Sequence, residues 1–223
     1  MNVSDSLRAN SNFRATIEKG SLHMALWSGR FEKGVSEFTQ EFGASLPVDK
    51  AMYHQDIAGS RAHARMLAAQ GVISQEDADA IVSGLAEIGK TIEEGNFVFD
   101  INDEDIHMSI EKVLTQNIGD AGARLHTGRS RNDQVITDTR LYAKMLAEDL
   151  MHDVNSLRAA LIKAARDNMG TILPGYTHMQ HAQPVLLSHH FMAYFWMFTR
   201  DFARLKQAYD AANANPLGSA ALA

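Results

Sequence analysis

The second half of the chain carries two long helical patterns of apolar residues. Between Gly128 and Gly170 there is no glycine or proline, and apolar residues recur every three or four positions, at Tyr142, Leu146, Leu150, Val154, Leu157 and Leu161. A continuous helix there would be on the order of 60 Å long. A second uninterrupted stretch, residues 185–215, carries Phe191, Tyr194, Phe195, Phe198 and Leu205. Because neither helix can bury its apolar face alone, we expect them to pack antiparallel in a bundle, with these faces forming core or subunit interface.

Shorter helical patterns precede these two. We expect one helix over residues 49–70 and a second that starts at Ser74, where the hydroxyl and Asp77 resemble a capping box, and ends near Gly95. A third, short helix is expected to start at Asp105, whose carboxylate suits the free amides of a helix start. With only four prolines in the chain, the pattern predicts an all-α fold in which strands are rare or absent.

Three segments follow from this pattern. Residues 1–23 are polar without hydrophobic periodicity and are expected to be a flexible leader, a misassigned start or a cloning remnant. Residues 24–128 are predicted to form a small N-terminal helical domain. Residues 129–223 are predicted to supply the beginning of a central bundle of long helices.

Composition narrows the class of partner. A formal net charge of −6 argues against bulk binding to nucleic acid or to an anionic membrane, so a small molecule is the better expectation. The chain has no cysteine, which removes disulfides, thiolate metal ligands and cysteine nucleophiles. No apolar run approaches a membrane span, and the first residues lack the apolar core of a secretory signal. We therefore expect a cytoplasmic protein.

Residues 125–134, Leu-His-Thr-Gly-Arg-Ser-Arg-Asn-Asp-Gln, gather polar groups around Gly128 just before the first long helix. Ser130 and Asn132 can either cap the free amides of that helix or bind the carboxylate of a ligand. Capping does not explain Arg129 and Arg131, because cations oppose the positive end of a helix. An anionic ligand at this loop would resolve the conflict.

Two further segments carry candidate chemistry. Residues 174–184 form a predicted loop between prolines, in which His178 or His181 could exchange protons near neutral pH. His178 and His181, with His189 and His190, could also be read as metal ligands, but no HExxH pattern or third acidic ligand accompanies them, so no metal is expected. Residues 103–107 supply carboxylates and an imidazole, and could equally be a solvated helix cap.

Together these motifs resemble the argininosuccinate lyases of the fumarase and aspartase superfamily. The resemblance runs from Met24 to the last residue, in the family's order and nearly its spacing, and rests on residues 25–31, 42–45, 103–107, 125–134, 175–178, 182–184 and 216–219. The Gly-Arg-Ser-Arg-Asn-Asp-Gln run is highly specific for this family, whereas fumarases, aspartases and adenylosuccinate lyases match less well. One departure is Ser28, where the family commonly has a second glycine.

The resemblance implies reversible β-elimination of argininosuccinate to arginine and fumarate, the last step of arginine biosynthesis, without cofactor or metal. It also implies that His178 transfers a proton. Carried over to this sequence, the substrate-binding residues would be Ser45, Asn132 and Thr177, with Ser130 and Arg131 beside them. Supporting roles would fall to Asp105, His107 and Gln183.

The family's third signature, a Gly-Ser-Ser loop that carries a proton-transfer serine, does not occur in these 223 residues. The resemblance further implies a homotetramer whose active sites combine loops from different subunits. We therefore expect this chain by itself to be inactive. Two alternatives remain: a non-catalytic, crystallin-like homologue, and a different lyase of the superfamily that acts on adenylosuccinate, malate or aspartate.

Overall fold

The computed structural model describes residues 36–222, and the chain divides into two units, residues 1–43 and 44–223. In the first unit the described part is the helix α2 (Glu37–Gly43), on which the rings of Phe38 and Phe42 stack with centroids 6.1 Å apart. The predicted leader and the motif at residues 25–31 lie outside the described residues.

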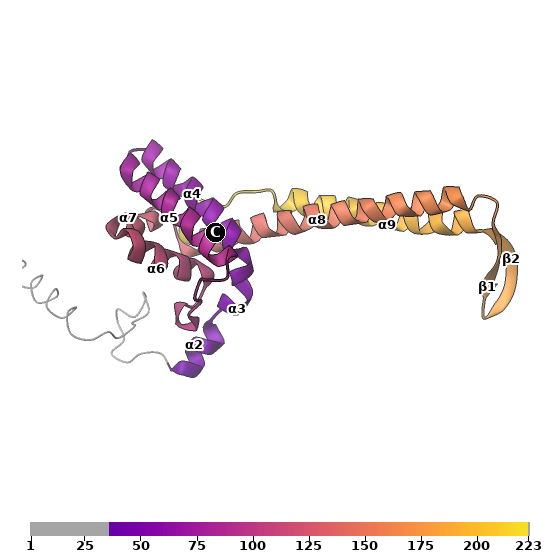
Figure 1. Cartoon of the computed structure of the whole chain (residues 1–223), viewed down its shortest axis with the longest axis horizontal. Coiled ribbons are helices and arrows are strands. Elements are labelled where there is room, and N and C mark those ends of the chain that lie inside the picture. Colours follow the sequence, from indigo (N-terminus) through magenta and orange to yellow (C-terminus); the bar gives the residue numbers. More distant parts are fainter. Residues whose placement is uncertain (1–35, 223) are drawn as a thin grey trace, which may run out of the picture. The chain divides into compact units, whose positions relative to one another are not determined.

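The second unit begins with a cluster of helices (Figure 1). In chain order these are α3 (Leu46–Asp49), η1 (Lys50–Met52), α4 (Tyr53–Ala69), α5 (Gln75–Glu93), η2 (Ile101–Asp103), α6 (Ile106–Ile118), α7 (Asp120–Ala123) and η3 (Arg124–His126). Their apolar faces meet in one core, whose largest fully buried side chains are Ile81, Leu85, Ile88, Ile106, Ile110, Leu114 and Leu125. Burial of these side chains is the main favourable term for this cluster.

The local signals for these helices are confirmed. The Ser74 hydroxyl accepts a hydrogen bond from the Asp77 amide at 3.0 Å, and α5 begins at the next residue. The Asp105 carboxylate accepts from the Met108 amide at 2.6 Å and so caps α6. The helix predicted over 49–70 begins instead as α3 and a 3-10 turn, and its regular part is α4.

The two long helical patterns form a hairpin of helices, α8 (Arg131–Asp167) and α9 (Leu187–Ala212), as expected. Figure 1 shows them side by side, reaching away from the helical cluster. The Arg158 guanidinium of α8 lies 5.0 Å from the Phe195 ring of α9, and Lys144 bonds Asn213 beyond the end of α9. No residue of α9 is fully buried, and Trp196 is 58% exposed. The pair therefore keeps an apolar surface that the described residues do not cover.

The segment predicted as a loop at 174–184 is a β-hairpin, and that prediction was wrong. Strands β1 (Ile172–Thr177) and β2 (Gln180–Leu186) pair antiparallel, with a bulge between Pro174 and Tyr176. His178 and Met179 form the turn with φ of 49° and 59°, as a two-residue hairpin turn requires. Both prolines fit, because a two-stranded ribbon has only edge strands, where a missing N–H is tolerated.

Candidate functional site

The predicted site residues lie at opposite ends of α8. Ser45, Asp105 and His107 belong to the helical cluster, and residues 130–132 to the start of α8. Thr177, His178 and Gln183 lie on the β-hairpin at the far end (Figure 1). With 37 residues, α8 is about 55 Å long. The two groups therefore cannot act on one small molecule within one chain.

At the start of α8, Ser130 and Asp133 form the capping box. The Ser130 hydroxyl accepts from the Asn132 amide at 3.2 Å, and the Asp133 carboxylate accepts from the Ser130 amide at 3.0 Å. The Asn132 side chain is exposed and donates from Nδ2 to the Ala221 carbonyl at 2.9 Å. Capping is thus present, and the Asn132 amide keeps a second N–H that a ligand could use.

The two arginines of the loop have partners inside the protein. Arg131 contacts Glu111 at 3.2 Å and Asp105 at 3.5 Å, and also donates to Gln134. Arg129 is buried and donates to the Ser60 hydroxyl at 2.9 Å. An anionic ligand is therefore not needed to explain why cations lie at this helix start, and the argument for an anion from these arginines loses its basis.

Ser45 lies beside the start of α6. Its hydroxyl donates to Asp49 Oδ2 at 2.5 Å, while Asp49 Oδ1 accepts from the Ile106 amide at 3.1 Å. The Glu104 carbonyl accepts from the Ser45 amide at 2.8 Å, and Glu104 has a left-handed φ of 69°. Non-glycine residues in this conformation are uncommon and concentrate at functional sites. Ser45 and Asp105 thus lie together beside the start of α6, and the contact between Arg131 and Asp105 connects them to the start of α8.

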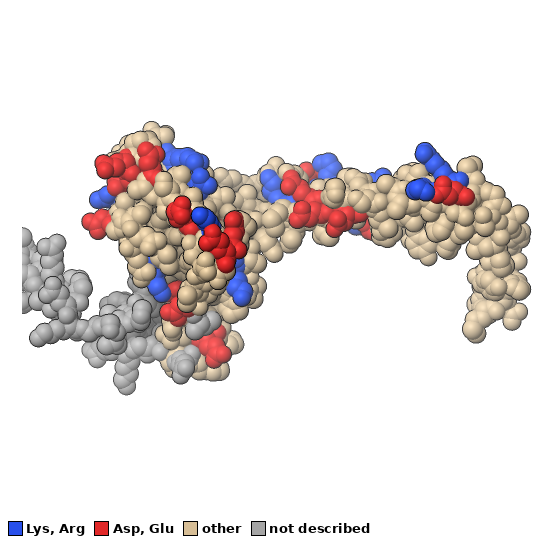
Figure 2. Space-filling view, viewed as in Figure 1, with Lys and Arg blue, Asp and Glu red and all other residues tan. Residues whose placement is uncertain are grey.

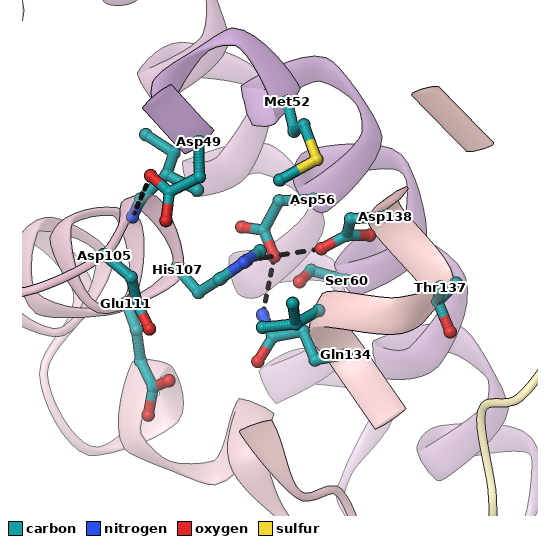
Figure 3. A network of polar contacts seen from close by, with 12 residues as sticks. Asp49, Met52, Asp56, Ser60, Asp105, His107, Glu111, Gln134, Thr137 and Asp138 are labelled. Atoms are coloured by element: carbon teal, nitrogen blue, oxygen red, sulfur yellow. Dashed lines mark hydrogen bonds and ion pairs between the residues drawn. The ribbon is translucent and has the colours of Figure 1, made fainter. Parts of the chain in front are cut away.

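A buried polar network near these residues connects α4, α6 and α8 (Figure 3). His107 Nδ1 lies 3.0 Å from Asp56 Oδ1 and 3.2 Å from Asp138 Oδ2, and Gln134 Nε2 donates to Asp56 at 2.5 Å. His107, Asp56 and Asp138 are all at most 2% exposed. His107, expected near a ligand, therefore lies inside the protein as the cation between two carboxylates.

The network shifts the proton affinities of its members. Burial disfavours the charged imidazole of His107, but its bonds to Asp138 and Asp56 prevail and raise its pKa to about 10. Burial raises the pKa of Asp138 to about 7, with the neighbouring Asp56 charge adding to the effect. Burial opposes ionisation of Asp56 as well, but its hydrogen bond with His107 holds its pKa below the usual range. The arrangement is a buried ion pair with a second carboxylate attached.

The same three residues are the group with metal-ligand spacing in the part of the chain that the structure describes. Asp56, His107 and Asp138 offer one imidazole nitrogen and two carboxylate oxygens within 4.8 Å of one another. That donor set could suit a transition metal. A proton on His107 Nδ1 accounts for the same geometry, because both carboxylates lie within hydrogen-bond range of it. The histidines at 178, 181, 189 and 190 do not form such a group among the described residues.

Sequence reasoning missed Asp56 and Asp138, and also the bonds that the Asp133 carboxylate accepts from the amides of Gly218 and Ala220. Asp56 and Asp138 lie inside long helices, where a lone aspartate is usually solvated, and their partner His107 is 51 residues from Asp56 in sequence. A signal was present, because Gln134 and Asp138 are four residues apart and so share one helix face. That face could be recognised as buried only once α4 was known to pack on it.

The far end of the hairpin differs in character. From residue 168 to residue 199 the sequence contains no Asp, Glu, Lys or Arg, and Figure 2 shows this end without coloured charges. Thr177, His178 and Gln183 are exposed there. The Tyr176 hydroxyl lies 2.8 Å from His181 Nε2, which orders the second histidine of the hairpin. An exposed surface that is uncharged and partly apolar is typical of a contact with another protein surface.

Known proteins resemble the chain over most of its length. A family model described as lyase matches residues 29–223. Argininosuccinate lyase of Nitratiruptor sp. is 50% identical over 198 residues, which are 89% of this chain and 43% of that protein. The enzyme of the same name from Geobacter metallireducens is 51% identical over 201 residues, 90% of this chain and 44% of that protein. The chain thus spans less than half the length of these relatives.

Solved structures of lyases also resemble the chain over most of its length. EDDS lyase in complex with formate superposes with a TM-score of 0.69 at 28% identity, covering 84% of this chain and 37% of that one. A fumarate lyase:delta crystallin from Brucella melitensis superposes with a TM-score of 0.66 at 20% identity, covering 79% of this chain and 45% of that one, which supports the fold alone. Among the described residues, no helix is both long and apolar enough to cross a membrane.

Proposed function

The chain belongs to the lyase family whose model it matches over residues 29–223, and on that premise we propose that the whole protein is an argininosuccinate lyase. The observation that carries the proposal is identity of 50–51% to argininosuccinate lyases over 89–90% of the chain. The reaction would split argininosuccinate into L-arginine and fumarate, and run in reverse. It would serve arginine biosynthesis in the cytoplasm.

The elimination sets clear chemical demands. A base removes the proton from the carbon beside a carboxylate, the electron pair forms the new double bond, and the C–N bond to the guanidino group breaks. The departing nitrogen then takes up a proton, so that the two products balance the substrate. We propose that Ser45, Asn132 and Thr177 hold the substrate by hydrogen bonds, with Ser130 and Arg131 beside them. No cofactor or metal takes part in this scheme.

His178 is proposed to transfer a proton, with Asp105, His107 and Gln183 in supporting roles. The exposure of His178 on the turn of the hairpin favours this role, because the imidazole is free to face a substrate held elsewhere. His107 would act only through others, since it is enclosed between Asp56 and Asp138.

A complete site requires two or more copies of the chain. Within one chain the two groups of proposed residues are separated by α8, which is about 55 Å long. The uncovered apolar surface of α8 and α9 offers the area on which copies can assemble. We therefore propose a homotetramer, in which the helical cluster of one subunit meets the hairpin tip of another.

Fumarate release from argininosuccinate by the full-length protein, followed by its ultraviolet absorbance, tests the activity. His178→Ala should lower kcat by about 10²–10⁴-fold, the usual contribution of a general acid or base. The matched control, His181→Ala on the same hairpin, should lose far less. Full turnover by His178→Ala would contradict the site assignment.

A substrate panel separates the alternatives. We expect turnover of argininosuccinate but not of malate, aspartate or adenylosuccinate. Turnover of another substrate alone would identify a different lyase of the superfamily, and none at all would favour a crystallin-like role. Fumarate release by the 223-residue chain alone, at ordinary enzyme rates, would contradict the expectation that further family motifs are needed.

Mixing two inactive variants tests the shared site. Full-length Asn132→Ala and His178→Ala subunits, denatured and refolded together, should regain activity, because some sites then receive both intact groups. Random assembly predicts intact pairs in about a quarter of the sites. Recovery no greater than the sum of the separate variants would refute a site shared between subunits.

A further inference from the structure

One buried carboxylate, that of Asp133, joins two segments that are far apart in sequence. Its Oδ1 accepts from the Ser130 amide at 3.0 Å, and its Oδ2 accepts from the amides of Gly218 and Ala220 at 3.2 and 2.9 Å. The adjacent Asn132 donates to the Ala221 carbonyl at 2.9 Å. The segment 216–222, here called the strap, is thereby fastened to the first turn of α8.

The backbone of the strap has an unusual shape that suits this contact. Gly218 and Ala220 have φ of 105° and 52°, and Ser219 donates its amide to the Pro216 carbonyl at 3.0 Å. With the Ser219 amide turned toward Pro216, the N–H groups of Gly218 and Ala220 point to a common place that suits an anionic oxygen. Here that oxygen is Asp133 Oδ2. An alanine keeps such a conformation only when its surroundings impose it.

The charge of Asp133 strengthens the contact. Burial disfavours its ionised form, but the amides of Gly218, Ala220 and Ser130 donate to it and hold its pKa below the usual range. A carboxylate can accept all of these bonds at once, whereas an asparagine amide would place an NH₂ group against one set of donors. This set of bonds between Asp133 and the amides of Ser130, Gly218 and Ala220, here called the clamp, is therefore specific for aspartate at this position.

The clamp also determines where the Asn132 amide points. Asn132 donates one N–H to the strap at Ala221, and its exposed side chain keeps a second N–H for another partner. If the strap moved, this amide would lose its orientation.

We propose that Asp133 is a positioning residue for the lyase reaction: by fastening the strap to the first turn of α8, it aims the Asn132 amide at the substrate. This inference rests on the proposed function. Asp133 itself does not touch the substrate, because its side chain is enclosed by the backbone groups it binds. Misplacing a binding group by about 1 Å can cost on the order of 10² in rate.

The test compares the full-length protein with Asp133→Asn. We expect kcat/KM for argininosuccinate to fall about 10²-fold, with a KM at least about tenfold higher, because Asn132 would hold the substrate less well. Hydrogen exchange at the amides of Gly218 and Ala220 should become faster in the folded variant. A merely structural role would lower the active fraction, and hence the apparent kcat, but leave KM unchanged.

Ser74→Ala is the control, since it weakens the start of another helix, α5, by removing the N-cap hydroxyl, away from the site. It should lower the melting temperature and leave KM unchanged. If Asp133→Asn does not fold, Gly218→Ala disturbs the strap from its other side, because φ of 105° is unfavourable for alanine, and a smaller rise in KM is expected.

Unchanged KM in both clamp variants, or unchanged exchange at the strap, would overturn the proposal. The two hypotheses fail in different ways. Wild-type protein without activity on argininosuccinate would refute the proposed function, while the exchange measurement would still decide whether Asp133 holds the strap. Activity with unchanged KM in the variants would refute only the positioning role.

Discussion

Removing the cation of the buried network should destabilise the protein strongly. His107→Gln leaves Asp56 and Asp138 facing each other without the imidazolium that now lies within 3.2 Å of both. Breaking a buried ion pair by deleting one partner costs about 3–5 kcal/mol. The pKa of His107 gives a similar figure, since a rise from 6.5 to about 10 corresponds to about 5 kcal/mol. We therefore expect the free energy of unfolding of His107→Gln to be about 3–5 kcal/mol lower than that of the wild type at pH 7.

The pH dependence follows from the direction of that shift. The pKa of His107 is higher in the folded than in the unfolded protein. Its contribution to the free energy of unfolding is therefore complete below pH 6.5 and is lost as the pH rises toward 10. The gap in the free energy of unfolding between wild type and His107→Gln should therefore be large at pH 7 and small at pH 10. Burial raises the pKa of Asp138 to about 7 even though His107 lowers it, so in the wild type Asp138 lowers stability as the pH rises from 3.8 toward 7.

Urea denaturation of the full-length protein, followed by circular dichroism at one protein concentration, measures the gap. The control is the double variant His107→Gln/Asp138→Asn, which removes one of the two uncompensated carboxylates. It should be more stable than His107→Gln alone. An equal gap at pH 7 and pH 10, or a double variant less stable than the single one, would refute the reasoning.

Three further substitutions test individual backbone and capping positions, and the midpoint of urea denaturation measures the change in stability for each. Ala220→Gly should stabilise by about 0.5–1 kcal/mol, because glycine relieves the left-handed conformation at φ of 52°; a destabilised variant would show that the alanine is not strained. Asp105→Ala should cost about 0.5–2 kcal/mol by removing the cap of α6, whereas Asp105→Asn should keep most of it; equal losses would argue against capping. Gly122→Ala should cost about 1–3 kcal/mol, since a Cβ would lie 2.8 Å from Thr115 Cα. Gly170→Ala, with open space around it, is the neutral comparison.

Helix positions were predictable where a local signal existed. The cap at Ser74 and the cap at Asp105 depend on bonds that span three residues, so the sequence contains all the information. The α8–α9 hairpin followed from periodicity and the absence of breakers. The β-hairpin was not predicted, because His178 and Met179 lack the glycine or asparagine that marks such a turn.

Site residues were predictable as types and not as an arrangement. The motif at 125–134 and the histidine at 178 stand out in the sequence, but their separation by the length of α8 does not. Arg131 was interpreted as a partner for an anion, whereas Glu111 and Asp105, 20 and 26 residues earlier, already contact it. Such pairing depends on how α6 packs against the start of α8.

The sequence by itself determined the helical class, the main helix boundaries and the family, because these depend on short-range spacing and on runs of residues. Tertiary structure decided which charges are neutralised inside the protein, that Asp133 fastens the strap, and that the two proposed halves of the site are far apart. The physical reason is range. Caps and periodicity act over a few residues, whereas burial and ion pairing join residues that only packing brings together. Residues 125–134 were recognisable from the start, but their partners Glu111, Gly218 and Ala220 were visible only in three dimensions.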